Sequence, residues 1–280
     1  MPVRVVTDST SDIPHEIARD LGITVVPLTV VFGEESFRDG VDIDAPAFYE
    51  RLIAAKELPR TSQPSVETFR DAYLQAAETS EEMVSIHVSS RLSGTINAAS
   101  VAREELSHQL HIDIIDSYNV SLGLGAIVIE AAEAARAGAT MEEVGRVARG
   151  AMDRVKWYAF LDTLEYLQRG GRIGRARALA GSILSIKPIL HAEDGEIAPF
   201  ERIRTRSKAV ERLYDLAMED AMVKRLYVAS ANNDDEAEAF VERLQPRMPH
   251  TDFVVGQFGP VIGVYTGPNA LGFCVVRRES

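Results

Sequence analysis

Runs rich in β-branched residues alternate with amphipathic stretches through the first half of the sequence. Residues 3–6, 23–32, 83–88 and 112–115 have the composition of buried strands. The stretches between them have helical spacing, and strands that alternate with helices are typical of a parallel sheet. The sequence therefore predicts an α/β fold with a mainly parallel sheet in its first half.

Capping residues indicate where the helices begin. Asp12, Asp44 and Ser65 each stand just before an amphipathic stretch, and we expect their side chains to cap the first backbone N–H groups. Thr140 with Glu143 matches a capping box, which predicts a helix to about residue 155. Residues 120–135 are apolar almost all round and predict a buried helix.

The second half predicts a mixed α/β arrangement. Asp194-Gly195 between two β-rich runs is typical of a hairpin. Residues 259–272 are rich in Gly and Pro, and we expect an irregular loop there. We place a boundary near residue 152, which gives domains of residues 1–152 and 153–280. Further elements are predicted as strand 157–161, hairpin strands 188–192 and 196–204, helix 207–222, strand 226–231, helix 235–244 and strand 253–255.

Composition restricts the class of protein. The chain has 280 residues, with 42 acidic and 30 basic side chains and a net charge of −12, which disfavours nucleic-acid and anionic-membrane binding. Cys274 is the single cysteine, so an internal disulfide is excluded and a reducing compartment is expected. We expect no stable membrane insertion, a cytoplasmic location, no metal site and no cofactor, because the sequence lacks a leader, a long apolar run and any metal-binding motif.

Three hydroxyl-rich loops follow predicted strands or precede predicted helices. They are residues 7–12, 61–65 and 89–95. Hydroxyls and free backbone N–H groups at a helix start can hold an anion, and ligands of open parallel sheets lie at the carboxyl ends of the strands. The alternative is that these residues only cap their helices. Tyr265 and Thr266, near the C-terminus, are further candidate donors.

Ser93 is also a candidate nucleophile, which would make the protein an acyl hydrolase. The sequence has no Gly-x-Ser-x-Gly elbow, so this hypothesis lacks its usual structural context. His87, in the strand before the Ser93 loop, would be the base, but its place in a buried strand favours a packed core histidine.

Two basic clusters lie in the second half. Residues 167–175 contain Arg172 among flexible glycines, and residues 202–208 contain Arg204. In an acidic protein, such clusters predict a docking face for a phosphate-bearing or acidic partner. The alternative is ordinary solvated surface charge.

An ordered set of motifs runs along nearly the whole chain. They are residues 6–12, Thr61-Ser62-Gln63-Pro64, residues 89–95 with Asn97-Ala98-Ala99, Asp116-Ser117, residues 166–174, Lys187-Pro188, Arg204-Thr205-Arg206 and Thr266-Gly267-Pro268. This set resembles the DegV family of fatty-acid-binding proteins. The resemblance implies two α/β domains with one long-chain fatty acid in a tunnel between them. It also implies a non-catalytic carrier that presents the carboxylate to a separate ATP-dependent fatty acid kinase subunit, which forms acyl phosphate.

The resemblance also implies a carboxylate site and its surroundings. Arg172 and Arg204 would lie near the mouth and face the kinase partner or its phosphates. The family often has histidine where this chain has Tyr265, which donates a hydrogen bond but carries no positive charge at neutral pH. A binder of a different anionic small molecule would have a short polar pocket instead of a long apolar tunnel. The expected carboxylate-binding residues are Thr61, Ser62, Ser93, Gly94, Thr95 and Tyr265.

Overall fold

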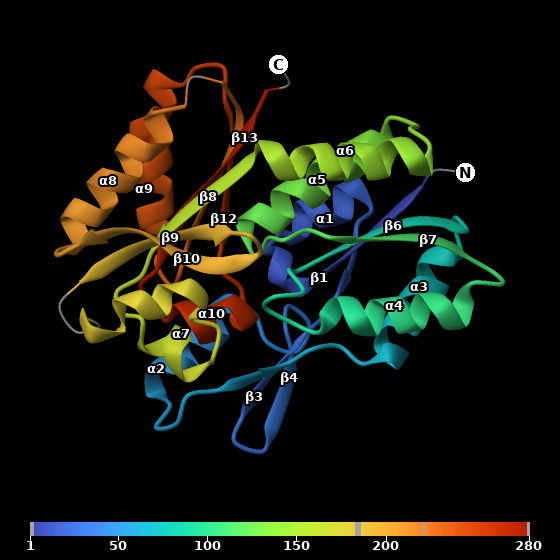
Figure 1. Cartoon of the computed structure of the whole chain (residues 1–280), viewed down its shortest axis with the longest axis horizontal. Coiled ribbons are helices and arrows are strands. Elements are labelled where there is room, and N and C mark those ends of the chain that lie inside the picture. The colour runs from blue at the N-terminus through green and yellow to red at the C-terminus, as the bar shows by residue number, and fades with distance from the viewer. Residues whose placement is uncertain (1–2, 183–185, 221, 279–280) are drawn as a thin grey trace.

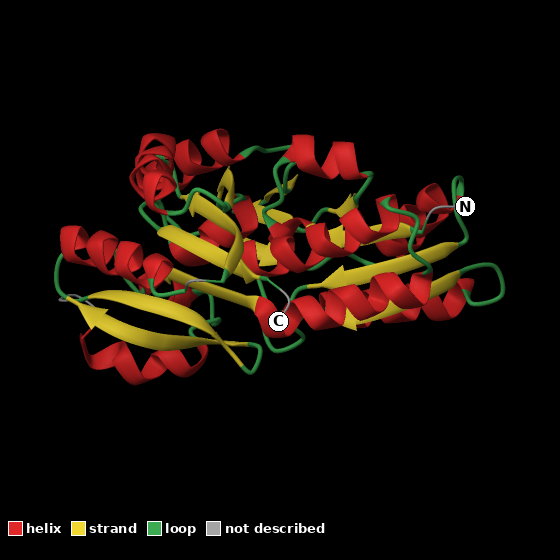
Figure 2. Ribbon diagram, turned by 90° about the horizontal axis from the view of Figure 1, so that it is seen from above, coloured by secondary structure: helices red, strands yellow, loops and turns green. Residues whose placement is uncertain are grey.

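The computed structural model describes residues 3–182, 186–220 and 222–278, and these form an α/β protein with three sheets. The two larger sheets lie toward opposite ends of the molecule, each accompanied by helices (Figures 1 and 2). One is a four-stranded sheet from the first half of the chain, and the other is a six-stranded sheet from the second half.

The four-stranded sheet is parallel throughout, which confirms the prediction for the first half. Its strands stand in the order β2-β1-β6-β7. Helices connect its strands in sequence, as expected for a parallel sheet. The strands are β1 (Arg4–Asp8), β2 (Thr24–Val26), β6 (Glu82–His87) and β7 (His111–Asp116), and the helices are α1 (His15–Leu21), α3 (Val66–Ala77) and α4 (Thr95–Leu106).

The run predicted as one strand over residues 23–32 contributes to two different sheets. It is interrupted at Pro27 and Leu28, where proline has no N–H to donate and the Leu28 N–H donates to Ser9 Oγ at 3.0 Å. The second part of the run starts a small antiparallel sheet in the order β4-β3-β5. Its strands are β3 (Thr29–Phe32), β4 (Glu35–Arg38) and β5 (Arg60–Ser62), with α2 (Ala45–Ala54) between the last two.

Two long helices connect the halves. α5 (Leu122–Arg136) is buried on nearly every side and packs against β1 as well as strands of the six-stranded sheet, as its apolar sequence predicted. α6 (Met141–Arg154) begins with the predicted capping box, in which Thr140 Oγ1 accepts from the Glu143 N–H. The six-stranded sheet begins directly after α6, close to the boundary expected near residue 152.

The six-stranded sheet is mixed, in the order β10-β9-β8-β13-β11-β12. The predicted hairpin is confirmed: Asp194 and Gly195 both have positive φ and connect two antiparallel strands. The elements are β8 (Val155–Phe160), α7 (Glu165–Arg169), β9 (Lys187–Glu193), β10 (Glu196–Ile203), α8 (Arg206–Met218), β11 (Val223–Ser230), α9 (Asp234–Leu244), β12 (Asp252–Gln257), α10 (Pro260–Thr266) and β13 (Leu271–Arg277).

The prediction of an irregular loop over residues 259–272 is wrong, because α10 forms within it. Pro260 is tolerated at the first helical position, where its missing N–H would have no partner. Gly263 lies where the helix meets α2, and an added Cβ there would come within 2.4 Å of Phe48 Cε1. Gly267 ends the helix with φ of 74°. The glycines thus permit close packing and termination of a helix.

The predicted helix-capping role of Asp12 is also wrong. Asp12 adopts a left-handed conformation, and its side chain accepts hydrogen bonds from the Gly259 N–H at 2.9 Å and from Ser121 Oγ. The residue before α1 is Pro14, which provides no side-chain cap. Asp12 therefore joins the first strand's loop to α5 and α10, both distant in sequence.

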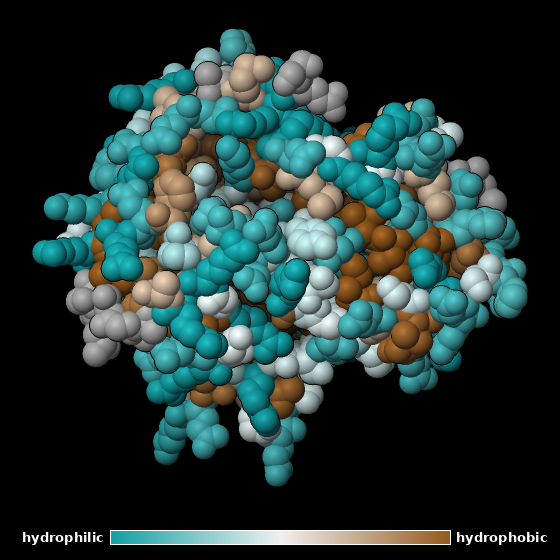
Figure 3. Space-filling model, in the orientation of Figure 1, coloured by the Kyte–Doolittle hydropathy of each residue, from teal (hydrophilic) through white to brown (hydrophobic). Residues whose placement is uncertain are grey.

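Most of the surface seen in Figure 3 is hydrophilic, and hydrophobic side chains gather toward the side of the parallel sheet. None of the described helices is long and apolar enough to cross a membrane.

Candidate functional site

A cavity lies between the two larger sheets. Loops at the carboxyl ends of β1, β6 and β7 form one side, where ligands of parallel sheets are expected. β8, β9, β10 and α10 of the second half form the other side. Most of the lining is apolar, including Leu28, Val88, Leu92, Val120, Leu122, Leu161, Leu167, Leu190, Ile197, Phe258, Val261 and Ile262.

A small group of polar side chains interrupts this apolar lining. Thr61 on β5 and Tyr265 on α10 share a hydrogen bond between their hydroxyls. The Arg172 guanidinium lies 5.5 Å from the centre of the Tyr265 ring, and its Nε donates to the Leu92 carbonyl, next to Ser93. Contacts therefore connect the polar residues of three separate segments.

The hydroxyls of this group occur in two hydrogen-bonded pairs. Thr61 pairs with Tyr265, and Ser93 Oγ lies 2.8 Å from Thr95 Oγ1. A hydrogen bond between two hydroxyls uses one of their two protons, so each pair retains one proton to donate. Thr61, Tyr265 and Ser93 line the cavity, whereas Thr95 is buried beside it. The arrangement leaves two hydroxyl donors for an anion in the cavity.

Gln63 and Gly94 bring the two hydroxyl-rich loops together. A Cβ on Gly94 would lie 2.3 Å from Gln63 Oε1, so only glycine allows the Gln63 side chain to pass this close. Gln63 itself lines the cavity. Its amide provides a further neutral donor and acceptor beside the hydroxyl pairs.

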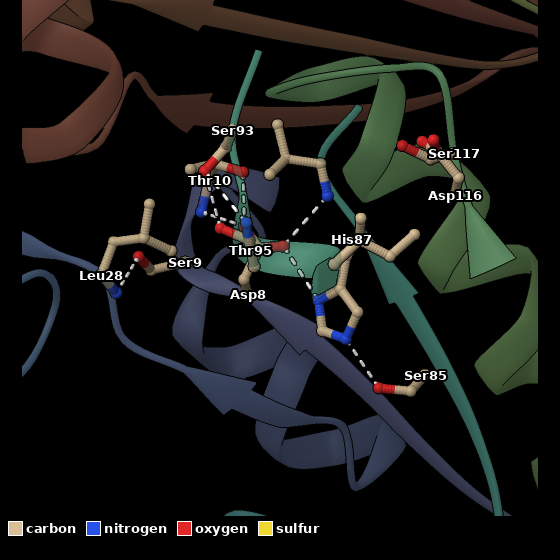
Figure 4. Close-up of polar contacts among 12 residues, drawn as sticks. Asp8, Ser9, Thr10, Leu28, Ser85, His87, Ser93, Thr95, Asp116 and Ser117 are labelled. Carbon is tan, nitrogen blue, oxygen red and sulfur yellow. Dashed lines mark hydrogen bonds and ion pairs between the residues drawn. The ribbon is translucent and has the colours of Figure 1, made fainter. Parts of the chain in front are cut away.

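A buried polar network supports the floor of the site (Figure 4). Asp8 is fully buried and accepts hydrogen bonds from the backbone and hydroxyl of Thr10, from the Val88 N–H at 3.0 Å and from His87 Nδ1 at 3.0 Å. These contacts satisfy the carboxylate without solvent. Since the Thr10 hydroxyl donates to Asp8, it faces the cavity as an acceptor and does not provide a donor for an anion.

The other side of His87 continues the same network. His87 Nε2 lies 2.7 Å from Ser85 Oγ, which in turn lies 2.9 Å from the Tyr73 hydroxyl. All three side chains are buried. His87 is therefore the packed core histidine that its strand position favoured, and both its ring nitrogens are hydrogen-bonded to residues other than Ser93. Neither nitrogen is free to act as the base of a serine nucleophile.

Two further buried carboxylates lie beneath the start of α10. Burial raises the pKa of Asp12 well above its ordinary value, against hydrogen bonds from Ser121 and Gly259 that lower it. Burial also raises the pKa of Asp39 to about 7, and Asp39 Oδ2 has no hydrogen-bond partner. Across the residues that the structure describes, no group of histidine, cysteine and acidic side chains is suited to holding a metal ion.

The structure brings together part of the predicted site. Thr61, Ser93, Tyr265 and Arg172 line the cavity. Ser62 is exposed and donates to the Gln63 carbonyl, while Thr95 and Gly94 position their neighbours without lining the cavity.

Arg204, which we expected near the mouth, is exposed in the turn between β10 and α8 and does not line the cavity. Other positions were not anticipated. Gln63 and Ser121 line the cavity, although the sequence did not single them out as site residues, and Thr10, from the hydroxyl-rich loop 7–12, lines it as well. Gln63 stands within the Thr-Ser-Gln-Pro motif, which was the one signal that pointed to it.

Comparisons with known proteins agree with the fold and the motifs. A family model described as "Uncharacterised protein, DegV family" matches residues 2–278. Protein DegV of Bacillus subtilis is 39% identical over 278 residues, covering 98% of this chain and 99% of that protein.

Solved structures are similar over nearly the full length. The crystal structure of Bacillus subtilis DegV, described as a fatty acid binding protein, superposes with a TM-score of 0.90 at 39% identity and covers 99% of this chain and 100% of that one. A DegV family protein from Thermus thermophilus, described by its fatty acid binding, gives a TM-score of 0.91 at 31% identity with the same coverage. This chain belongs to the DegV family.

Proposed function

We propose that the protein binds one long-chain fatty acid, with its hydrocarbon chain in the cavity and its carboxylate against the hydroxyl pairs. The observation that carries this proposal is a cavity of mostly apolar lining in which Thr61, Ser93 and Tyr265 provide neutral donors. Two solved relatives of the same fold are described as binding fatty acid, which supports the same ligand class here.

The two parts of the ligand have different energetic roles. About fourteen methylenes at about 0.8 kcal/mol each give roughly 11 kcal/mol of gross stabilisation. Association itself costs about 4 to 15 kcal/mol, so the apolar chain is needed for affinity. A buried carboxylate costs several kcal/mol, and each charge-assisted hydrogen bond returns about 1.5 to 3 kcal/mol, so two or three donors offset the cost. The hydroxyl pairs and Gln63 provide that number.

We further propose that the bound acid is presented to a separate ATP-dependent kinase subunit. A carboxylate oxygen attacks the γ-phosphorus of ATP, the bond between this phosphorus and the β,γ-bridging oxygen breaks, and the products are acyl phosphate and ADP. Arg172, exposed beside Tyr265, favours the approach of the phosphates. In this proposal the chain is the carrier and the partner holds the nucleotide.

A hydrolase using Ser93 receives no support from the geometry. The Ser93 hydroxyl is paired with Thr95, and His87 is held by Asp8 and Ser85. We therefore expect a serine-directed phosphonate to leave the protein unlabelled. Stoichiometric labelling of Ser93 would refute the carrier role in favour of catalysis.

The test is to extract purified protein with organic solvent, identify released acids by mass spectrometry and measure uptake of added acid. We expect about one acid per chain, weaker retention in Ser93→Ala and unchanged retention in Ser107→Ala. Ser107 is an exposed serine at the end of α4 and serves as the matched control. Protein that carries no acid and takes none up would overturn the proposal. For the kinase step, acyl phosphate yield that is unchanged in Arg172→Ala and Arg204→Ala would remove the docking role of both arginines.

A further inference from the structure

Thr10 and Ser121 line the cavity with hydroxyl groups whose protons are already used by the protein. The Thr10 hydroxyl donates to Asp8 (Figure 4), and the Ser121 hydroxyl donates to Asp12. Each oxygen keeps lone pairs, and none of the residues that the structure describes donates to either of them. In contrast to the hydroxyl pairs described above, these residues therefore offer acceptors to the cavity.

The two residues lie together on the cavity wall. The Ser121 N–H donates to the Thr10 carbonyl at 2.8 Å, which joins the loop after β1 to the start of α5. Asp12 accepts from the Gly259 N–H at 2.9 Å as well as from Ser121, so the start of α10 is fixed against the same place. Both hydroxyls thus belong to one position in the cavity.

The surroundings of this position are apolar. Val120 and Leu122, on either side of Ser121 in the sequence, line the cavity, and so do Phe258 and Val261. Acceptors that are covered by plain hydrocarbon lose water and gain no hydrogen bond, which lowers the affinity of such a ligand. A chain that carries a polar group at this position avoids the loss.

The position lies away from the site proposed for the carboxylate. Asp12 binds Gly259, just before α10, whereas Tyr265 lies near the other end of this helix. At about 1.5 Å per helical residue, Gly259 and Tyr265 are about 9 Å apart along the axis of α10. A polar group that meets Thr10 and Ser121 is therefore carried part-way along the hydrocarbon chain.

The two wall residues select the kind of polar group. Thr10 Oγ1 requires a donor, which a carbonyl group on the chain does not supply. Burial raises the pKa of Asp12 well above its ordinary value, and a protonated Asp12 donates to Ser121 Oγ and leaves the Ser121 proton for the cavity. A hydroxyl both donates and accepts, so it matches Thr10 together with either state of Ser121.

We propose that Thr10 and Ser121 form a binding position for a hydroxyl group on the hydrocarbon chain, so that the protein prefers a long-chain hydroxy fatty acid to its unsubstituted counterpart. The inference rests on the proposed function, because the hydrocarbon chain must occupy the cavity for its hydroxyl to reach this position.

The ligand arm of the test compares octadecanoic acid with position isomers of hydroxyoctadecanoic acid by calorimetry. Isomers with the hydroxyl near the carboxylate, in the middle of the chain or at its end have the same composition, so differences in affinity report the place of the hydroxyl. We expect the mid-chain isomer to bind about ten-fold tighter than the chain-end isomer. It should also bind tighter than the oxo acid with a carbonyl at the same carbon.

The protein arm repeats these titrations with Thr10→Val and Ser121→Ala. Each variant should lose the preference for the mid-chain isomer without weaker binding of octadecanoic acid, which also reports that the variant is folded. Ser121→Ala leaves the contacts of Asp8 intact and tests the position independently of Thr10→Val. Thr79→Val is the matched control, because the Thr79 hydroxyl donates to the Ala76 carbonyl just after α3 and does not line the cavity.

The outcomes separate this inference from the proposed function. Equal weakening of all hydroxy isomers relative to octadecanoic acid would refute the hydroxyl position alone, as would a mid-chain preference that survives in both variants. A protein that binds neither octadecanoic acid nor any of the isomers would refute the proposed function and this inference together.

Discussion

The hydroxyls of Thr61 and Tyr265, 204 positions apart in sequence, are hydrogen-bonded to each other at the polar end of the cavity. β5 provides one and α10 the other, so the contact joins the two halves of the chain where the ligand's head group is proposed to lie. The pair needs no ligand to satisfy it. A bound carboxylate would take the proton that the pair does not use.

This pairing predicts that the two hydroxyls substitute for each other. In Thr61→Val or Tyr265→Phe, the remaining hydroxyl is released from its partner and still donates to the carboxylate. The double variant loses the donor altogether, and we expect its affinity for fatty acid to fall by about ten-fold, more than the two single effects combined. Calorimetric titration of the four proteins measures this, with Tyr118→Phe as an exposed control. Additive single effects would contradict the shared-donor arrangement.

We expect substitution by alanine to have opposite effects on stability at Gly263 and at Gly150. Gly263→Ala places a methyl group 2.4 Å from Phe48 Cε1 and 2.9 Å from the Tyr49 hydroxyl, so we expect a loss of about 1 to 3 kcal/mol in the free energy of unfolding. Gly150 lies within α6 with nothing near its added Cβ, and Gly150→Ala should stabilise by about 0.5 to 1 kcal/mol. Urea denaturation gives both values, and a neutral Gly263→Ala would show that α10 shifts freely against α2.

Because the Asp39 carboxyl is buried, we expect the protein to lose stability as the pH rises. Burial raises the pKa of this carboxyl to about 7, so the native protein keeps a proton that the unfolded chain releases above its ordinary value of 3.8. The stabilisation is complete below the unfolded pKa and is lost as the pH rises to about 7. In Asp39→Asn the Asp39 contribution to this loss should be absent while that of Asp12 remains, so the fall between pH 4 and 7 in the free energy of unfolding should shrink by on the order of a few kcal/mol.

Asp42→Asn is the matched control for this pH experiment. The hydrogen bond from Arg38 lowers the pKa of Asp42 to about 2 from its ordinary 3.8, so this carboxyl is ionised in the native state throughout and nearly fully ionised in the unfolded chain above about pH 5. Its removal should leave the slope of stability against pH unchanged between about pH 5 and 7. Parallel curves for the wild type and Asp39→Asn would show that Asp39 does not carry the effect.

Among the ion pairs between α5 and the six-stranded sheet, we expect substitution of Glu130 to lower the free energy of unfolding most. It is buried, and Lys224 Nζ lies 2.7 Å from its Oε1, with Arg225 at 3.5 Å and Arg154 at 3.7 Å. Glu130→Gln leaves these cations without their shared carboxylate, and we expect a loss of about 2 to 4 kcal/mol. Glu133→Gln, one turn away and more exposed, should cost less. Thermal unfolding of both variants tests the ranking.

Local sequence signals predicted much of the fold because the corresponding interactions are local. Ser65 caps α3 and Thr140 forms its capping box as expected, and Asp194-Gly195 forms the hairpin turn. Asp12 has the same local signal as Ser65, yet its carboxylate binds Gly259 and Ser121. Partners so distant in sequence leave no local pattern.

The same distinction applies to the site. Thr61 and Ser93 lie in hydroxyl-rich motifs and were predicted, whereas the contact between Gln63 and Gly94 arises only when two loops meet. The glycines of α10 led us to expect a loop, but Gly263 allows the helix to pack closely against α2 and Gly267 ends it.

The hydroxyls of the cavity come from β5, the Ser93 loop and α10, whereas Leu190 and Ile197 of its apolar lining come from the β9-β10 hairpin. Substitutions of Leu190 or Ile197 would therefore change the shape of the cavity without changing the hydroxyl group that we propose binds the carboxylate. Related proteins could therefore differ in the hydrocarbon chain that they prefer while keeping the same hydroxyl-bearing segments.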